Sequence, residues 1–128
     1  MKGPAPSRWH RLLALLGAAA IALPVAAEGD AQRGAAVHAA RCGGCHSVDA
    51  DRVGPRHAGV FGRRAGAVAG FDYSPALKAS HITWDATTLD RWLTDPESLI
   101  PGQRMGYSLG DPALRADVIA YLASLKSP

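Results

Sequence analysis

Several residue types that build common functional sites are scarce in this 128-residue chain. It holds only two cysteines, Cys42 and Cys45, and beyond Met1 it holds a single methionine, Met105. A structural zinc site usually takes four protein ligands, and no second Cys or Cys/His pair stands at a suitable spacing. No segment alternates polar and apolar residues for long, and no internal repeat is present. A zinc site is therefore disfavoured, and we expect an all-α fold.

A long apolar run is also missing, which decides how the first residues are interpreted. Residues 12–23 form an apolar run of 12 residues, well short of the roughly 20 that a membrane-spanning helix needs. Basic residues without any acid open the chain, and small residues follow the run up to Ala27. This pattern predicts that residues 1–27 are a cleaved secretory signal peptide. Glu28 would then begin a periplasmic domain, residues 28–128, with a retained anchor as the alternative.

The net charge of the whole chain is misleading for the same reason. Three of the 14 basic residues lie in residues 1–27, whereas all 11 acidic residues lie after them, so the expected mature chain carries 11 charges of each sign. A nucleic-acid partner would need a basic patch. We therefore expect neither a nucleic-acid partner nor stable membrane insertion after cleavage.

The two cysteines stand together in Cys42-Gly43-Gly44-Cys45-His46, the Cys-x-x-Cys-His pattern of covalent haem attachment. Two thiols at this spacing add to the two vinyl groups of one porphyrin, and the adjacent histidine binds its iron. A thioredoxin-type redox disulfide is the alternative, but it belongs in a strand–helix–strand setting that the sequence lacks. Met105 lies in a turn-rich loop rather than on a helical stripe, which favours a second iron ligand over a core side chain.

Helix signals flank the motif and recur towards the C-terminus. Asp30 is a plausible N-cap for a helix over residues 30–41, and Ser74-Pro75 begins a short helix that ends near residue 79. Asp85 caps a segment that Pro96 stops. Asp111-Pro112 opens the last helix, which has one apolar stripe: Leu114, Val118, Tyr121, Leu122 and Leu125. The glycine-rich stretch 43–70 has loop character, which a cofactor lying against it would explain.

With these features in place, the chain resembles the class I monohaem cytochromes c over nearly all of residues 28–128. The matching stretches beyond the Cys-x-x-Cys-His motif are Gly54-Pro55, residues 59–66, residues 70–74, Ile82-Thr83-Trp84, residues 92–96, residues 101–105 and residues 115–122. The resemblance implies a small fold of three to four helices, with long loops wrapped around one covalently bound haem c. It also implies a crossing of the first and last helices at Gly34 and Tyr121.

The resemblance further implies a set of haem-binding residues. Cys42 and Cys45 would carry the thioethers, and His46 and Met105 would bind the iron from opposite faces. The carbonyl of Pro55 would accept a hydrogen bond from His46, and a buried haem propionate would receive donors from three further residues: Arg63, Tyr73 and Trp84.

The function implied is that of a soluble one-electron carrier, not an enzyme, in an exported respiratory or photosynthetic chain. Its partners would be redox proteins, namely a cytochrome bc-type complex, a terminal oxidase or a dehydrogenase, and the carrier would be a monomer. Two alternatives stay open: a dedicated electron-transfer subunit of a dehydrogenase complex, and a small haem peroxidase or gas-binding protein. Three rival iron ligands have no spacing that recommends them: His38, Lys78 and His81.

Several positions depart from the family pattern. A histidine, His57, stands where the family often has leucine, and we expect its side chain to be solvated rather than to titrate beside the haem. Leucine, tryptophan and glutamine replace more usual residues at Leu77, Trp92 and Gln103. Lysines are few, so we expect a docking rim of arginines: Arg64, Arg91 and Arg104. Tyr107 would lie near the exposed haem edge.

Overall fold

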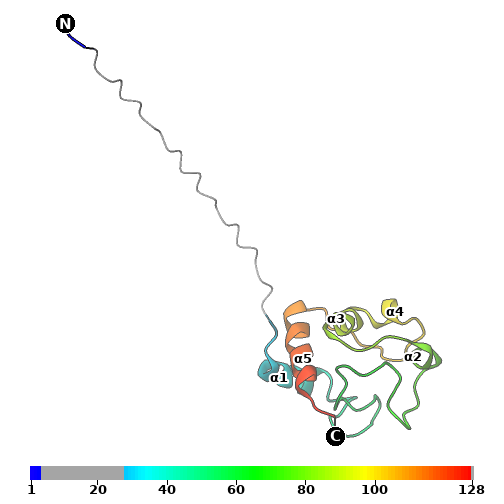
Figure 1. Ribbon diagram of the computed structural model, residues 1–128. Coiled ribbons are helices and arrows are strands. Elements are labelled where there is room, and N and C mark those ends of the chain that lie inside the picture. The colour runs from blue at the N-terminus through cyan, green and yellow to red at the C-terminus, as the bar shows by residue number, and fades with distance from the viewer. Residues whose placement is uncertain (4–27, 128) are drawn as a thin grey trace.

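The computed structural model describes residues 1–3 and 28–127, so residues 4–27 of the expected signal peptide lie outside the described part. The chain forms five helices in this part: α1 (Ala31–Arg41), α2 (Pro75–Ala79), α3 (Ala86–Thr94), α4 (Pro96–Leu99) and α5 (Pro112–Ser124) (Figure 1). Its only β-type pairing among the described residues is an isolated bridge between Arg64 and Thr83. The expected all-α fold is confirmed. Within the same residues, no helix has the length and apolar character that crossing a membrane requires.

The helices begin where the N-cap residues indicated. The side chains of Asp30, Ser74, Asp85 and Asp111 each accept a hydrogen bond from a backbone N–H in the first turn of the helix that follows. Such bonds satisfy donors that a helix leaves unpaired at its start. The structure adds one element to those expected, because Pro96 ends α3 but is also the first residue of α4, which Asp95 caps.

The first and last helices cross at a glycine. Helix α1 (cyan) packs against α5 (red) in the most extensive contact between any two helices (Figure 1). A Cβ atom on Gly34 would clash with the backbone oxygen of Asp117 and would lie 2.8 Å from the Cβ atom of Tyr121. The expected crossing at Gly34 and Tyr121 is confirmed, and it explains why a helix tolerates a residue with a low helical propensity.

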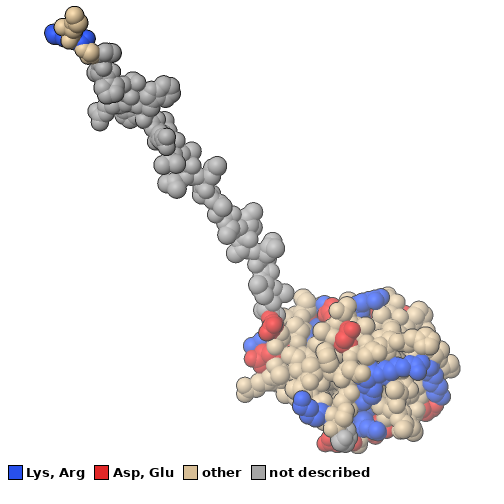
Figure 2. Space-filling view, viewed as in Figure 1, with Lys and Arg blue, Asp and Glu red and all other residues tan. Residues whose placement is uncertain are grey.

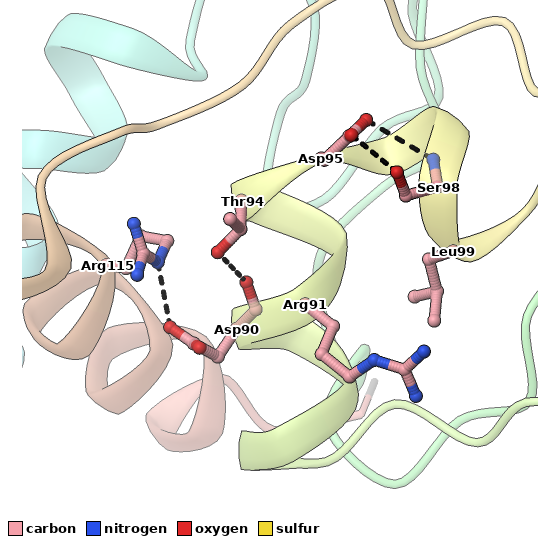
Figure 3. A pocket seen from close by; sticks show the side chains of 7 residues that line it. All are labelled: Asp90, Arg91, Thr94, Asp95, Ser98, Leu99 and Arg115. Atoms are coloured by element: carbon pink, nitrogen blue, oxygen red, sulfur yellow. Dashed lines mark hydrogen bonds and ion pairs between the residues drawn. The ribbon is translucent and has the colours of Figure 1, made fainter.

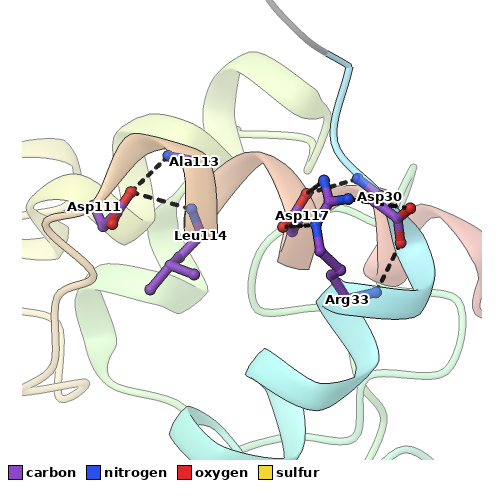
Figure 4. A network of polar contacts seen from close by, with 6 residues as sticks. All are labelled: Asp30, Arg33, Asp111, Ala113, Leu114 and Asp117. Carbon is purple, nitrogen blue, oxygen red and sulfur yellow. Dashed lines mark hydrogen bonds and ion pairs between the residues drawn. The ribbon is translucent and has the colours of Figure 1, made fainter.

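An acidic side chain on α5 fastens the start of α1 to this crossing (Figure 4). Asp117 is 6% exposed, and its carboxylate accepts hydrogen bonds from the backbone N–H of Asp30 at 2.7 Å and from Nε and Nη2 of Arg33, both at 2.9 Å. These donors, Arg33 first, hold the pKa of Asp117 below its ordinary value. A carboxylate this buried is tolerated because each of its oxygens is paired.

The remaining chain consists mainly of loops that pack on a shared core. The buried hydrophobic residues of the core come from loops as well as helices: Val60, Ala65, Val68, Tyr73, Leu77, Trp84, Leu89, Leu93, Ile100, Leu109, Val118, Ile119 and Leu122. Loop backbones pair with each other, as where Trp84 N donates to Arg63 O at 2.9 Å and Ala65 N donates to Ile82 O at 2.8 Å. The loops therefore take fixed positions around the motif at the end of α1.

Candidate functional site

The Cys-x-x-Cys-His motif forms the turn that ends α1. Cys42 is the C-cap residue, and its carbonyl accepts hydrogen bonds from Cys45 N at 3.0 Å and His46 N at 2.9 Å. Both thiols are free; Cys42 is partly buried against the core, and Cys45 is exposed. Burial raises the pKa of the Cys42 thiol, and Cys45 adds to that effect. The turn thus places two thiols and one imidazole within five consecutive residues.

The ring of His46 is fixed through one of its two nitrogens. Its Nδ1 lies 2.8 Å from the carbonyl oxygen of Pro55, so this nitrogen carries the proton and donates. Burial lowers the pKa of His46, against the effect of this bond. Gly54 leaves space for the ring, because a Cβ there would lie 2.6 Å from both ring nitrogens. The neutral imidazole therefore keeps Nε2 as a lone-pair donor, which is the form that binds a metal.

An arginine that the sequence did not single out braces the motif turn. Arg52 donates from Nη1 to the carbonyl of Gly43 at 2.7 Å and from Nη2 to that of Gly44 at 3.3 Å. In addition, Gly54 N donates to Cys45 O at 2.9 Å. The segment that carries Pro55 is thus tied to the cysteine turn at several points. The signal was weak because a lone arginine in a loop is usually a solvated charge.

The expectation of a solvated His57 is wrong. Its ring stacks on that of His46, with centroids 4.1 Å apart and planes 20° from parallel. Its Nδ1 lies 2.9 Å from Nε2 of His38, a residue of α1 that is 5% exposed. Burial, followed by the neighbouring histidines, lowers the pKa of His57 to about 2. Because α1 supplies a hydrogen-bonding partner, the partly buried imidazole is stable in a place where an unpaired polar ring would be costly.

The methionine loop lies between α4 and α5. Gly102 adopts a φ of +89°, which favours glycine, and its N–H donates to a carboxylate oxygen of Glu97 at 2.9 Å. Gln103 donates from Nε2 to the other oxygen at 3.1 Å, while its own Oε1 is buried without a hydrogen-bonding partner in the described part of the chain. Met105 is partly buried and packs against the same core as Cys42. The loop thus contains a thioether that packs against the core and a buried acceptor without a hydrogen-bonding partner.

The three residues expected around a propionate are all partly or fully buried. Arg63 donates to the carbonyls of Ala58 at 3.1 Å and Arg56 at 2.9 Å, and burial lowers the pKa of its guanidinium. Tyr73 and Trp84 are each 7% exposed. The Tyr73 hydroxyl accepts a hydrogen bond from Val68 N at 3.1 Å, and burial raises its pKa. Arg63 thus holds its loop through neutral carbonyls, and no ion pair balances it among the described residues.

Two surface grooves are separate from the motif. One lies at the junction of α3, α4 and α5, where Asp90 and Arg115 point towards each other and Arg91 extends away from them (Figure 3). Arg115 binds Asp90 at 2.8 Å and the carbonyls of Leu109 and Gly110, both at 2.9 Å, so its donors hold the fold together. The other groove runs beside Arg56, Phe61 and Arg63. Neither contains a cysteine, a methionine or a histidine.

Basic side chains gather around α2. Arg64 donates to the carbonyl of Ser80 at 2.9 and 3.1 Å, while Lys78 and Arg104 form ion pairs with Asp72 at 3.5 and 3.6 Å. We call Arg64, Lys78 and Arg104 the α2 basic cluster. Figure 2 shows Lys and Arg side chains on the side of the domain that carries α2. Arg91, expected in the same rim, instead lines the groove of Figure 3 together with Asp90 and Asp95.

Comparison with known proteins agrees with this geometry. The family model "Cytochrome c" matches residues 31–126. Cytochrome c2 of Rhodomicrobium vannielii is 41% identical over 117 residues, covering 88% of this chain and 93% of the relative. Cytochrome c2 iso-2 of Magnetospirillum fulvum is 51% identical over 87 residues, covering 66% and 91%. The structure of cytochrome cH from Methylobacterium extorquens superposes with a TM-score of 0.71 at 41% identity, covering 75% of this chain and 99% of that one. The chain belongs to the cytochrome c family.

The membership carries the broad chemistry. The chain is an electron carrier with covalently bound haem c, and the residues present fit that group. Two free thiols, Cys42 and Cys45, precede a fixed imidazole that has one nitrogen available, and the thioether of Met105 lies against the same core as Cys42. Within the described ranges, no three His, Cys, Asp or Glu residues gather in a group that could hold a metal ion. The rival ligands are otherwise engaged or exposed: His38 binds His57, Lys78 pairs with Asp72, and His81 is on the surface.

Proposed function

We propose that the chain works as an exported, soluble, monomeric one-electron carrier in which His46 and Met105 bind the haem iron. The observation that carries the proposal is the hydrogen bond from His46 Nδ1 to Pro55 O at 2.8 Å. It leaves only Nε2 free, and it increases the electron density on the imidazole that a metal ligand uses. Cys42 and Cys45 are proposed to form the two thioethers. Haem c, when bound, supplies an iron that accepts and releases one electron.

The chain's own residues favour electron transfer over substrate chemistry. Rigid ligands lower the reorganisation that each electron transfer requires. The hydrogen bonds of the motif turn, and those of Gly102 and Gln103 to Glu97 in the methionine loop, would limit the motion of His46 and Met105. A thioether ligand in an apolar pocket disfavours the more positive ferric state and raises the reduction potential. Met105 as an iron ligand would also close the position that a peroxidase or a gas-binding protein keeps open.

A propionate contact for Arg63, Tyr73 and Trp84 is also proposed. Arg63 is half-buried and binds only neutral carbonyls. A guanidinium in such a place is stabilised by an anion, since burial of an uncompensated charge is costly. The carboxylate of a haem propionate would provide that anion, with the Tyr73 hydroxyl and the Trp84 indole as further donors.

We further propose that the α2 basic cluster docks redox partners with acidic surfaces. Complementary charge raises the rate of association, and salt screens it. The partner classes that fit are a cytochrome bc-type complex, a terminal oxidase and a dehydrogenase. A triple variant, Arg64→Gln, Lys78→Gln and Arg104→Gln, should lower the second-order rate of partner oxidation and flatten its dependence on ionic strength. An unchanged salt dependence would contradict this docking surface.

Carbon monoxide binding to the reduced holoprotein tests the ligand assignment, because CO binds iron only where a coordination position is open. The parent should show no CO difference spectrum at neutral pH. Met105→Leu, which keeps the apolar volume but removes the thioether, should bind CO and have a lower reduction potential. Leu99→Ala is the matched control, since it removes a partly buried side chain that packs on the same core, and it should stay closed. Rapid CO binding by the parent would instead favour a peroxidase or gas-binding protein.

Export is proposed on the sequence pattern of residues 1–27. N-terminal sequencing of the haem protein purified from a periplasmic fraction should give Glu28 as the first residue. Recovery of the full-length chain in the membrane fraction would instead support a retained anchor.

A further inference from the structure

Beside the proposed iron ligand lies a pair of histidines, the buried His38 and the partly buried His57, that the haem-binding role does not require. His57 stacks on the ring of His46 at 4.1 Å, and His38 holds the outer edge of His57 through the 2.9 Å contact between Nε2 and Nδ1. His38 in turn lies on α1 beside Tyr121 of α5, with ring centroids 5.2 Å apart. A continuous series of contacts therefore runs from the helix crossing to the face of the imidazole.

We propose that His38 is a positioning residue that acts through His57 to fix the plane of the His46 ring. The inference rests on the proposed role of His46 as iron ligand. The hydrogen bond to Pro55 anchors one edge of the His46 ring, and a single bond still permits the ring to tilt about it. Contact with a parallel ring over the whole face resists that tilt, provided that the contacting ring is itself held.

His57 is held at both its backbone and its side chain. Its N–H donates to Ser47 O at 3.0 Å, and Ala58 N donates to Val48 O at 2.8 Å, which pins the segment against the residues that follow His46. The side chain can still rotate about its own bonds, and the contact with His38 removes that freedom. His38 belongs to α1. The orientation of the His46 ring is therefore fixed relative to a helix rather than to a loop.

The experiment reads the orientation of the ligand plane by proton NMR of the ferric holoprotein. The four haem methyl resonances are spread by the unpaired electron, and their spread depends on the orientation of the axial ligand planes. His38→Leu removes the hydrogen bond. His38→Gln keeps a hydrogen-bonding amide group near the place of imidazole Nε2. His81→Leu removes an exposed histidine and is the control for an equal change of residue type elsewhere.

The proposal predicts that the methyl spread shifts in His38→Leu and stays at the parent's value in His38→Gln and His81→Leu. Parent-like shifts in His38→Leu, or equal shifts in the Leu and Gln variants, would overturn it, since packing alone would then account for the pair. If His38→Leu fails to hold haem, the double variant His38→Leu/His57→Leu replaces both polar groups and is tested in the same way. A parent without a low-spin His/Met spectrum would contradict the ligand assignment instead, so the two failures are distinguishable.

Discussion

The helix crossing and the haem-site loops are stabilised by different kinds of contact. At the crossing of α1 and α5, backbone meets backbone at Gly34, and the carboxylate of Asp117 satisfies the start of α1. Around the site, arginine side chains donate hydrogen bonds to backbone carbonyls of the loops. Arg52 binds the motif turn in this way, and Arg63 binds its own loop. The contacts at the crossing are therefore all made between residues of the chain and need no cofactor. The loops have polar and apolar groups that fit a cofactor.

The difference leads us to expect that haem contributes to folding mainly through the loops. A domain of about 100 residues buries only about two thirds of the surface that its unfolded chain exposes. The buried acceptor of Gln103 and the half-buried guanidinium of Arg63 both lie in the loop half of the molecule. We therefore expect cofactor binding there to contribute to the free energy of folding. Variants that perturb one region at a time should therefore separate the two contributions.

Loss of both thiols should destabilise the loops around the haem site, residues 43–70 above all. The double variant Cys42→Ala/Cys45→Ala cannot form thioethers, so we expect it to lose haem on purification. Its unfolding should then no longer be cooperative. Hydrogen exchange should be fast throughout residues 43–70, with any remaining protection confined to α1 and α5. Far-UV circular dichroism and amide exchange measure this. Full protection of residues 43–70 from exchange without haem would show that these loops fold without the cofactor.

A methyl group at Gly34 should destabilise the crossing of α1 and α5. Gly34→Ala places a Cβ against the backbone oxygen of Asp117, and overpacking of this kind costs about 3 kcal/mol of unfolding free energy. In a domain of this size that loss lowers Tm by roughly 10 °C or more. The matched control is Gly110→Ala, where an added Cβ meets nothing within 4 Å. Equal stability of the two variants in thermal denaturation would contradict a crossing fixed by backbone contact.

Acid should weaken the crossing through Asp117. Its pKa in the folded protein lies below the ordinary value of 3.8, first because of Arg33 and then because of the N–H of Asp30. A depressed carboxyl pKa adds stability that is complete above the unfolded pKa and is lost as pH falls through the folded pKa. Stability should therefore fall with decreasing pH below about 4. Asp117→Asn should be less stable at pH 7 and should have a shallower acid limb.

The control for that titration is Asp49→Asn, which replaces an exposed aspartate. Denaturant unfolding of the holoprotein at a series of pH values compares the three proteins. An acid limb in Asp117→Asn as steep as that of the parent would assign the effect to other carboxylates, such as Asp85 or Asp95, whose pKa values are also lowered by hydrogen bonds from Thr88 and Ser98.

The comparison also explains which features the sequence could predict. Helix starts follow local rules, so Asp30, Ser74, Asp85 and Asp111 marked four helices correctly. Helix α4 was missed because Pro96 satisfies two local rules at once, the end of one helix and the first position of the next. The fold class was confirmed, since it depends on short-range pattern.

What escaped prediction depends on contacts between distant segments. His57 was expected to be solvated because its partner His38 is 19 residues away, and no local pattern joins them. Arg52 was overlooked because its acceptors are backbone carbonyls, which every residue offers. The ligand role of Met105 and the propionate contacts stay predictions, because they depend on a bound group rather than on the chain alone.

The smallest effect is expected where Arg52 braces the motif turn. Its two donors bind the carbonyls of Gly43 and Gly44 at an exposed position, so the variant Arg52→Ala should lose about 1 kcal/mol of unfolding free energy, the usual net value of such bonds. Arg52→Lys keeps the charge but loses the fork that reaches two acceptors, and it should recover less than half of the loss. Guanidinium unfolding of the holoproteins compares the series. Full recovery by lysine would mean that charge near the turn, rather than the paired hydrogen bonds, stabilises the loop half.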